Sequence, residues 1–339
     1  MAITGFVYPV AVHWGWSAEG WLSAFRVGDD GNADPSLGAN GLIDFAGSGV
    51  VHVTGGAAAL MAAYFVGPRA GRFNPDGTVN DMPGQATVLS VAGTFILWFG
   101  WYGFNPVSTL VFVDSMAVAT RVAVTTTISA AAGGITSLAV HVLRRQPPDL
   151  PPTLNGILAG LVGVTAGCPV VDSQGAFAIG IISAFVYTLW SEMLKRLRID
   201  DPLDASSVHM ASGIWGVIAV GLFATESNTC SAGYASCADD YGAFYGGGGR
   251  QLGVQLAGAF GLSLWSLAMS TALFGLMALA GVLRVSKADE AVGLDFSHHG
   301  GAAYFGEGQI AASVNALAQK VLEEGGGGAK KECLAPTSE

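Results

Sequence analysis

Long apolar stretches alternate with short polar connections along this chain, and the alternation predicts an α-helical protein that crosses a membrane several times. A helix needs about 20 apolar residues to cross a hydrocarbon layer of roughly 30 Å. Seven stretches approach that length: residues 45–67, 86–105, 122–143, 153–171, 175–194, 205–224 and 252–282. Residues 4–14 are apolar over about half of it and predict the end of a further helix. A soluble all-helical fold is the poorer alternative, because these stretches are too long and too many for buried core helices.

One polar pattern occurs twice at the start of an apolar stretch. The copies are Asp44-Phe-Ala-Gly-Ser-Gly-Val-Val-His52-Val-Thr-Gly-Gly56 and Asp201-Pro-Leu-Asp-Ala-Ser-Ser-Val-His209-Met-Ala-Ser-Gly213. An Asp at this place predicts a helix N-cap, and Pro202 suits the first helical position. Eight residues at 1.5 Å each would place either histidine about 12 Å inside its helix, near the middle of the bilayer.

The distribution of Lys and Arg among the loops predicts the orientation of the spans. One set of loops holds most of them: Arg69, Arg72, Arg144, Arg145, Lys195, Arg196, Arg198, Arg284 and Lys287. The opposite set holds only Arg26, Arg121 and Arg250. The first set is therefore expected to be cytoplasmic. The spans after Asp44 and Asp201 would then run in opposite directions, as in an inverted repeat with its site at the midplane. Chance recurrence of a short pattern is the alternative.

His52 and His209 are the leading candidates for chemistry, because an ionisable side chain within a membrane is a functional hypothesis by default. Two neutral imidazoles can pass a proton between ring nitrogens, which suits a small polar molecule or a proton. The pattern suits a metal poorly, since no further ligand stands at metal-binding spacing. The alternative for either histidine is a ring that only bonds a backbone carbonyl.

Aromatic residues gather toward the expected outer face, where Trp14, Trp16, Trp98, Trp101, Tyr102 and Phe104 end two apolar stretches. They are compatible with an interfacial aromatic belt. They are also compatible with a cage for a small cation, with Asp44 and the Ser108 hydroxyl nearby.

Composition supports the membrane prediction and excludes several other classes. Charged residues are 12% and hydrophobic residues 51% of the chain, and the mean hydropathy is +0.49. No basic stretch accompanies the net charge of −10, so no nucleic-acid partner is indicated. No enzyme motif, dinucleotide fingerprint or phosphate loop is present, so no enzyme activity and no cofactor are predicted. Cys230 and Cys237 can form a local disulfide if their loop faces an oxidising compartment.

Six motifs together resemble the ammonium transporter family, related to the Rhesus proteins, and most closely its plant and algal branch. They are Asp44-Phe-Ala-Gly-Ser-Gly-Val-Val-His52, Trp98-Phe-Gly-Trp-Tyr-Gly-Phe-Asn-Pro106, Thr165-Ala-Gly-Cys168, Asp200-Asp-Pro-Leu-Asp204 with His209, Tyr245-Gly-Gly-Gly-Gly-Arg250 and Gly293-Leu-Asp-Phe-Ser-His-His-Gly300. The resemblance implies an inverted-repeat fold of eleven spans, assembled as a trimer with one pore per subunit. The family's first three spans and most of the fourth have no counterpart here, so the chain is expected to be N-terminally truncated.

The resemblance also implies roles for particular residues. His52 and His209 match the twin pore histidines, Trp16 and Ser108 the external recruitment site, and Asp44 the buried carboxylate below it. Phe104 matches the inner gate phenylalanine and Trp101 a neighbouring pore aromatic, while Asp201 and Asp204 are expected to be structural. The implied mechanism is capture of ammonium, its deprotonation, and passage of ammonia along the histidines, with the proton conducted separately. Met210 stands where the family usually has Gly, which is expected to narrow the pore.

Residues 1–284 are expected to form the transmembrane domain and residues 285–339 a cytoplasmic regulatory tail, disordered from about 325. Ser297 takes the place of a threonine that is phosphorylated in plant relatives, and a phosphate there would disturb a docked tail. An ordinary surface serine is the alternative.

The sequence therefore predicts an ammonium transporter, with methylammonium as a second candidate substrate. It is expected in the plasma membrane as a homotrimer, or as a heterotrimer with related subunits. One rival is a non-conducting truncated subunit that acts as a regulator or ammonium sensor. Another is a transporter for a different small substrate.

Overall fold

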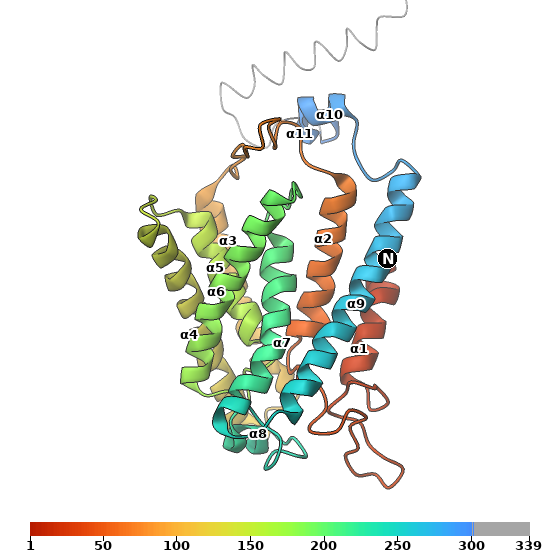
Figure 1. The fold of residues 1–339 in the computed structure, drawn as a ribbon, viewed down its shortest axis with the longest axis vertical. Helices are drawn as coiled ribbons and strands as arrows, with labels where there is room; N and C mark the ends of the chain where they lie inside the picture. Colours follow the sequence, from red (N-terminus) through yellow and green to blue (C-terminus); the bar gives the residue numbers. More distant parts are fainter. Residues whose placement is uncertain (300, 302–339) are drawn as a thin grey trace, which may run out of the picture. The chain divides into compact units, whose positions relative to one another are not determined.

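The computed structural model describes residues 1–299 and 301, and within them it confirms the all-α prediction, with only isolated β-bridges besides helices (Figure 1). The expected disorder from residue 325 lies outside the described residues. The helical elements in order are η1 Ile3–Val7, α1 Tyr8–Trp16, η2 Ser48–Val53, α2 Thr54–Val66, α3 Thr87–Phe104, η3 Pro106–Thr109, α4 Met116–Leu143, α5 Leu150–Val164, α6 Ser173–Arg196, η4 Ser206–Ala211, α7 Ser212–Phe223, α8 Glu226–Ser231, η5 Ala243–Tyr245, α9 Arg250–Leu279, α10 Lys287–Val292 and α11 Leu294–Ser297.

The chain divides into two compact units, Met1–Met277 and Ala278–Glu339. The first unit holds the apolar helices. In the described part of the second unit, the Ser286 side chain accepts a hydrogen bond from the Asp289 amide and caps α10. Arg284 there forms an ion pair with Glu290, at 2.8 Å between Nη2 and Oε2. The regulatory role expected for this unit stays a prediction.

Within the described residues, six helical segments are long and apolar enough to cross a membrane, which is one fewer than the seven expected full spans. They are Ser48–Val66, Thr87–Thr109, Met116–Leu143, Ser173–Arg196, Ser206–Phe223 and Arg250–Leu279. The apolar stretch 153–171 is helical only as far as Val164. Residues 165–171 are buried but not helical. Pro169, which cannot donate a backbone hydrogen bond, lies within this buried turn and is incompatible with a regular helix there.

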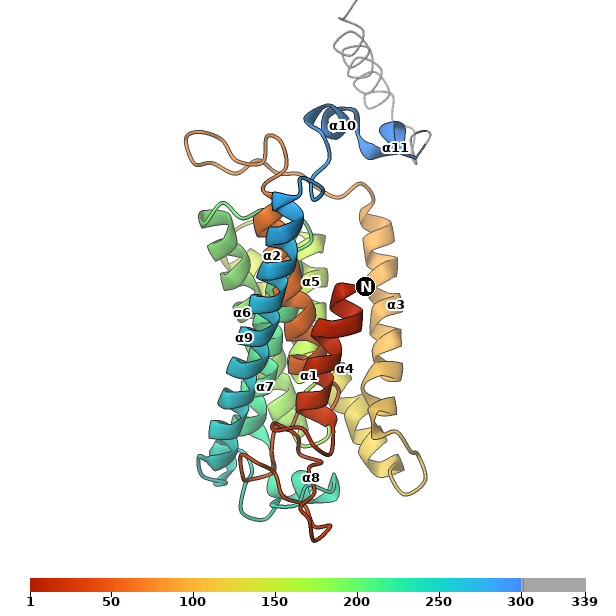
Figure 2. The same cartoon turned by 90° about the vertical axis from the view of Figure 1, so that its right-hand side faces the viewer.

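The connections gather at two opposite ends of the helices of the first unit (Figures 1 and 2). Residues 17–43 and α8 lie at one end, and the loops 67–86 and 197–205 lie at the other. α2 therefore runs toward the second end, whereas α7 runs away from it (Figure 1). The opposite directions expected for the two motif copies are found.

Small residues allow α4 and α5 to approach closely. A Cβ atom on Gly133 would overlap the Gly156 carbonyl, and one on Gly160 would overlap the Ser129 carbonyl. The Ser129 hydroxyl donates to the Gly160 carbonyl at 2.7 Å and adds a polar contact between the two helices. Such pairs of small residues let helix backbones pack where side-chain volume would hold them apart.

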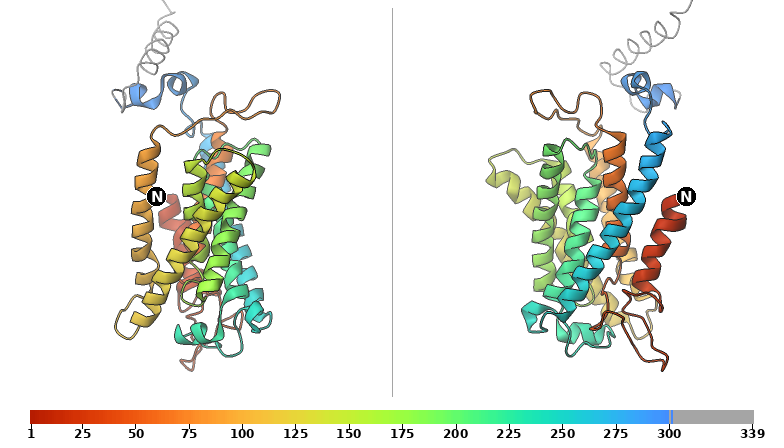
Figure 3. Two further views of the ribbon diagram at one scale, coloured as in Figure 1. Left: turned by 90° about the vertical axis from the view of Figure 1, so that its left-hand side faces the viewer. Right: turned by 45° about the vertical axis from the view of Figure 1, so that its right-hand side comes forward.

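The helix α9 contributes a narrow buried stripe rather than a broad face. Its buried residues recur at helical spacing: Gln251, Val254, Gln255, Gly258, Ala259, Leu262, Ser266 and Ser270. The short helix α1 lies beside α9 (Figure 3), where the Trp265 indole donates to the Val7 carbonyl at 2.9 Å. Trp14 also contacts Trp265, with ring centroids 5.2 Å apart.

Candidate functional site

His52 lies in a π-helical opening of its span, nearer the helix start than expected. The helical segment begins at Ser48, four positions before His52, and not at Asp44. The intervening residues are held outside the helix, because the Phe45 and Ala46 amides donate to the carbonyls of Ala166 and Thr165. The predicted depth of about 12 Å inside the helix is therefore wrong.

Asp44 still caps this helix, but across a longer loop than an ordinary N-cap. Its Oδ2 accepts hydrogen bonds from the Gly49 amide at 3.0 Å and the Val50 amide at 2.7 Å. Gly47 has a left-handed backbone, with φ of 101°, which lets the chain turn into the helix.

The second copy repeats this construction. The Asp201 carboxylate accepts from the Ala205 amide at 3.0 Å and the Ser206 amide at 2.7 Å. His209 lies in the π-helical segment Ser206–Ala211, and Pro202 lies in the turn before it instead of at the first helical position. Asp204, which stands where the first copy has Gly47, also has a positive φ, of 54°. In both copies an Asp carboxylate accepts backbone amides, a residue with positive φ makes the turn, and the histidine lies in a π-helical segment. The two copies therefore have the same local backbone conformation.

The two histidine rings meet, although they lie 157 positions apart in the sequence. Their centroids are 5.2 Å apart and their planes differ by 13°. His52 is 8% exposed, and neither its Nε2 nor the Nδ1 of His209 has a hydrogen-bond partner among the described residues. The pair therefore offers unpaired ring nitrogens to a small polar molecule or a proton.

Two aromatic side chains from the end of α3 join the histidine pair. The Trp101 ring stacks on His52 at 5.3 Å with 13° between the planes, and the Phe104 ring lies 5.6 Å from His52. The Trp101 indole donates to the Thr165 hydroxyl at 3.0 Å, and that contact fixes the orientation of the ring. Phe104 is 37% exposed, so it lies at the open side of the group.

Trp16 and Asp44 lie together at the end that contains α8. The Trp16 indole donates to the Asp44 carbonyl at 2.8 Å, and the Asp44 residue is 2% exposed. The Ser108 hydroxyl instead donates to the Phe104 carbonyl at 2.8 Å. No direct contact joins Trp16 to Ser108 among the described residues, so the structure brings Trp16 to Asp44 and Ser108 to Phe104 as two separate pairs.

Met210, expected to narrow the pore, is instead part of helix packing. The residue is 4% exposed and belongs to a buried apolar cluster with Val53, Ala57, Leu60 and Leu194. Gly56 lies directly against its backbone, where a Cβ would overlap the Met210 amide. The thioether is thus accommodated between α2 and η4.

The end that contains the second motif copy is held by side-chain carboxylates. Asp204 accepts from the Ser191 hydroxyl at 2.6 Å and from the Tyr187 hydroxyl at 3.4 Å. Asp200 accepts two hydrogen bonds from the Arg69 guanidinium, at 2.7 and 2.9 Å, and pairs with Arg72 at 3.3 Å. Desolvation opposes ionisation of Asp200, but these hydrogen bonds and charges outweigh it and lower the pKa of its carboxyl.

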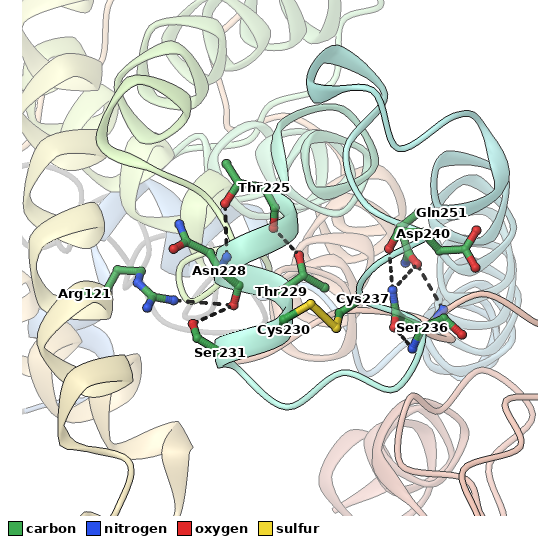
Figure 4. The surroundings of a disulfide bond; sticks show 11 residues. Arg121, Thr225, Asn228, Thr229, Cys230, Ser231, Ser236, Cys237, Asp240 and Gln251 are labelled. Atoms are coloured by element: carbon green, nitrogen blue, oxygen red, sulfur yellow. Dashed lines mark hydrogen bonds between the residues drawn. A yellow bond between two sulfur atoms is a disulfide. The ribbon is translucent and has the colours of Figure 1, made fainter.

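Cys230 and Cys237 are joined in a disulfide in the loop between α7 and α9 (Figure 4). The same loop contacts the segment before Asp44 through Asn40. The Asn40 side chain accepts from the Ser236 amide at 2.7 Å and donates to the Asp240 carbonyl. The loop is fixed on its other side by Arg121, whose guanidinium donates to the carbonyls of Pro169 and Asn228.

The sequence reasoning missed two features of this region. It did not identify Thr165 as the partner of Trp101, or Gln251 and Gln255 as partners of the loop before Asp44. The two glutamines were detectable in the sequence, because they stand one helical turn apart in an otherwise apolar stretch. The partners of Thr165 had no sequence signal, since they depend on the fold.

The profile of the Ammonium Transporter Family matches residues 1–304. The chain belongs to this family. It is 40% identical over 312 residues to ammonium transporter 1 member 2 of Oryza sativa subsp. japonica, covering 89% of this chain and 62% of that protein. It is 39% identical over 311 residues to ammonium transporter 1 member 1 of Arabidopsis thaliana, covering 89% of this chain and 61% of that protein. The chain thus spans about three-fifths of the length of these relatives, and the family resemblance expected from the six motifs is confirmed.

Solved structures of the family have the same fold. One described as a sensor Amt protein has a TM-score of 0.73 and 33% sequence identity, with 87% of this chain and 67% of that chain covered. Mep2 of Candida albicans has a TM-score of 0.70 and 30% identity, with 84% of this chain and 58% of that chain covered. The chain is therefore a multi-pass helical membrane protein with the fold of the ammonium transporters.

Proposed function

We propose that this chain takes part in ammonium transport, with ammonia passing the His52–His209 pair. The observation that carries the proposal is the contact of these two rings at 5.2 Å, with unpaired ring nitrogens and two aromatic neighbours. Apolar aromatic faces around a neutral polar pair suit a small uncharged molecule that can hydrogen-bond. An anion would find no complementary charge there, and a sugar would find too few hydrogen-bonding groups for its hydroxyls.

Capture of ammonium begins in this proposal at the end that contains Trp16. The indole face of Trp16 attracts a small cation. The Trp16 indole bonds the backbone carbonyl of Asp44, and the carboxylate of that residue makes the electrostatic potential there negative. The Ser108 hydroxyl, which now donates to a carbonyl, keeps its oxygen as an acceptor for the ammonium protons. Deprotonation follows, because the cation finds no counter-charge among the rings farther in, and an unpaired nitrogen of the histidine pair accepts the proton.

Transfer past the histidines needs an alternation of donor and acceptor nitrogens. Neutral imidazole has one of each, so the pair can accept from ammonia with one nitrogen and donate to it with another. The proton follows separately along the same nitrogens. The hydrogen bond to Thr165 fixes the Trp101 ring, which stacks on His52. This stacking holds the His52 ring in one orientation for both ammonia passage and proton transfer.

The assembly, location and regulation belong to the same proposal. The α3 surface is strongly apolar and exposed, with Val88, Ile96 and Phe99 each at least 71% exposed. Lipid or a neighbouring subunit would cover it, in keeping with a homotrimer or a heterotrimer with related subunits. We assign the protein to the plasma membrane with its basic loops and C-terminus in the cytoplasm. Ser297 is the proposed regulatory phosphorylation site.

The test is uptake of labelled methylammonium and ammonium-evoked current in oocytes that express residues 1–339, with surface amounts measured. His52→Ala and His209→Ala should abolish uptake or uncouple it from current. His141→Ala is the matched control, because that histidine lies on α4 and, among the described residues, its ring bonds the Ser137 carbonyl of the same helix, 3.1 Å away. Equal uptake in all four chains would contradict the proposed pathway.

A second candidate function is ammonium sensing without transport, which the likeness to a structure described as a sensor favours. The two functions differ in what happens after binding. Surface-exposed chain that binds labelled methylammonium but shows neither uptake nor current would establish the sensor. Uptake that saturates and is lost in His52→Ala would establish the transporter.

A further inference from the structure

Two fully buried glutamines on α9 hold the loop that leads into Asp44. Gln251 and Gln255 are both 0% exposed and lie one turn apart. A buried amide side chain is costly in a membrane helix unless its polar atoms are bonded. Both side chains are bonded, and their partners are mostly backbone atoms of residues 40–43.

Gln255 pairs with both backbone groups of Ile43, as a neighbouring strand would. Its Oε1 accepts from the Ile43 amide at 2.9 Å, and its Nε2 donates to the Ile43 carbonyl at 2.8 Å. The same Nε2 donates to the Val217 carbonyl of α7 at 2.8 Å. Gln255 therefore links the loop to the helix that continues from His209.

Gln251 extends the pairing by one turn. Its Nε2 donates to the Gly41 carbonyl at 2.9 Å and to the Oε1 of Gln255 at 3.1 Å, while its Oε1 accepts from the Asn40 amide at 3.2 Å. The backbone of this buried loop belongs to no helix or strand, and besides an isolated bridge of Leu42 with Ser23 several of its groups need side-chain partners. The two glutamines supply the missing partners, which fixes the position of each bonded residue.

The residue after Ile43 is Asp44, where the fixed loop meets the recruitment site. Asp44 accepts the Trp16 indole through its carbonyl and the Gly49 and Val50 amides through its side chain. A displacement of Ile43 moves Asp44, and with it both the Trp16 ring and the start of the helix that carries His52.

We propose that Gln255, supported by Gln251, is a positioning residue that sets the affinity for ammonium at the Trp16–Asp44 site. The inference rests on the proposed function and extends it from the site residues to α9. It assigns no contact between Gln255 and the substrate. Its effect should therefore appear in capture, and the passage of ammonia at the histidine pair should be little changed.

The first test compares Gln255→Met, which keeps the length of the side chain and removes its hydrogen bonds, with wild type in methylammonium uptake. KM should rise about tenfold, equivalent to about 1.4 kcal/mol, while the maximal rate per surface molecule stays within about twofold. Gln251→Met, which leaves the Ile43 pairing intact, should raise KM less. Ser270→Ala is the control, because Ser270 is equally buried on the same stripe of α9 and lies far from the loop. An unchanged KM in Gln255→Met would overturn the proposal.

A double-mutant cycle separates positioning from general destabilisation. If Gln255 acts through the Trp16–Asp44 site, Gln255→Met should leave KM unchanged in a Trp16→Leu background, because the element that it positions is already lost. The same increase in KM in both backgrounds would overturn the inference. So would a fall in maximal rate with no change in KM, which is the result expected of a purely structural role.

Hydrogen exchange in nanodiscs tests the positioning without relying on transport. Gln255→Met should speed exchange of the amides of residues 40–50, and Ser270→Ala should leave them as in wild type. Should wild type show no uptake, the proposed transport fails, while this comparison still decides whether Gln255 positions Asp44. Unchanged exchange at residues 40–50 in Gln255→Met would reject it.

Discussion

The two copies of the Asp-to-His motif share a backbone, but their surroundings differ. In the first copy the carboxylate of Asp44 is almost fully buried and, among the described residues, bonds only backbone amides, and the turn is made by Gly47. In the second copy Asp201 is partly exposed, and the turn is made by Asp204, whose side chain adds bonds to α6. The shared backbone conformation places both histidines, whereas the burial and side-chain bonds around Asp44 and Asp201 differ.

The interactions that fix the loops also differ between the two ends. The end with Asp44 is fixed by the disulfide loop, Asn40 and two glutamines, together with one ion pair between Asp240 and Arg250 at 3.2 Å and the Arg121 guanidinium on backbone carbonyls. The end with Asp201 is fixed by ion pairs of Asp200 with Arg69 and Arg72. Among the described residues, Asp44 forms no ion pair and its carboxylate accepts only backbone amides, so no side-chain cation competes with an incoming one. The ion pairs of Asp200 make the other end sensitive to pH and salt.

The largest effects are expected when the Asp44 and Asp201 carboxylates are each removed. Asp44→Ala should lower the free energy of unfolding by about 3 kcal/mol or more, because two buried amides lose their acceptor. Asp201→Ala should cost about 1 kcal/mol, since water can reach that turn. Thermal unfolding in detergent measures both. Asp44→Asn, which keeps an acceptor oxygen, should recover much of the loss, and equal effects of the two Ala substitutions would remove the contrast.

The Cys230–Cys237 disulfide is the covalent bond among the interactions that fix the end with Asp44. Reduction of Cys230–Cys237, or Cys230→Ser with Cys237→Ser, should destabilise the protein by about 2 kcal/mol, the magnitude expected for a short closed loop. The effect should be confined to the end with Asp44, because that loop contacts Asn40. Hydrogen exchange should therefore rise at residues 38–44 and not at residues 67–72. An equal rise in hydrogen exchange at both ends would show that the disulfide and the ion pairs do not act independently.

The two turns differ in their tolerance of a side chain. Gly47→Ala should cost about 1–2 kcal/mol, since its φ of 101° disfavours any Cβ and Val51 and Trp16 lie against it. Asp204→Asn should cost less, because Asn tolerates the left-handed region and can keep the bond from Ser191. Chemical denaturation in detergent compares the two. A larger loss for Asp204→Asn would mean that the side-chain bonds outweigh the backbone requirement.

The smallest expected effect is a pH dependence at the ion-paired end. The pKa of Asp200 is lowered in the folded state, so its contribution to stability is present above the ordinary carboxyl pKa of about 3.9 and is lost as pH falls through the lowered value. The Tm should decline as pH falls below about 4, and Arg69→Gln should flatten that decline. An identical pH profile in Arg69→Gln would place the titration elsewhere.

The sequence alone determined the class of the protein and the identity of its central residues. Long apolar stretches require helices in a membrane, because backbone groups in hydrocarbon must be bonded within the segment. The repeated Asp-to-His spacing and the basic loops gave the opposite directions of α2 and α7. The six motifs gave the family. All of these follow from local patterns that can be recognised in the amino-acid sequence.

Only the tertiary structure decided where the helices begin and which side chains meet. Phe45 and Ala46 stay outside the helix because Ala166 and Thr165 accept their amides, and these contacts cross 121 and 119 positions of sequence. The apolar stretch 153–171 leaves the helix after Val164, and there distant contacts act together with Pro169, which was visible in the sequence. The carbonyls of Cys168 and Pro169 accept from Thr125 and Arg121. Likewise Trp101 meets His52, and Gln255 meets Ile43, through distant contacts. A hydrogen bond to a remote backbone group leaves no periodicity in the sequence, so only the folded chain reveals it.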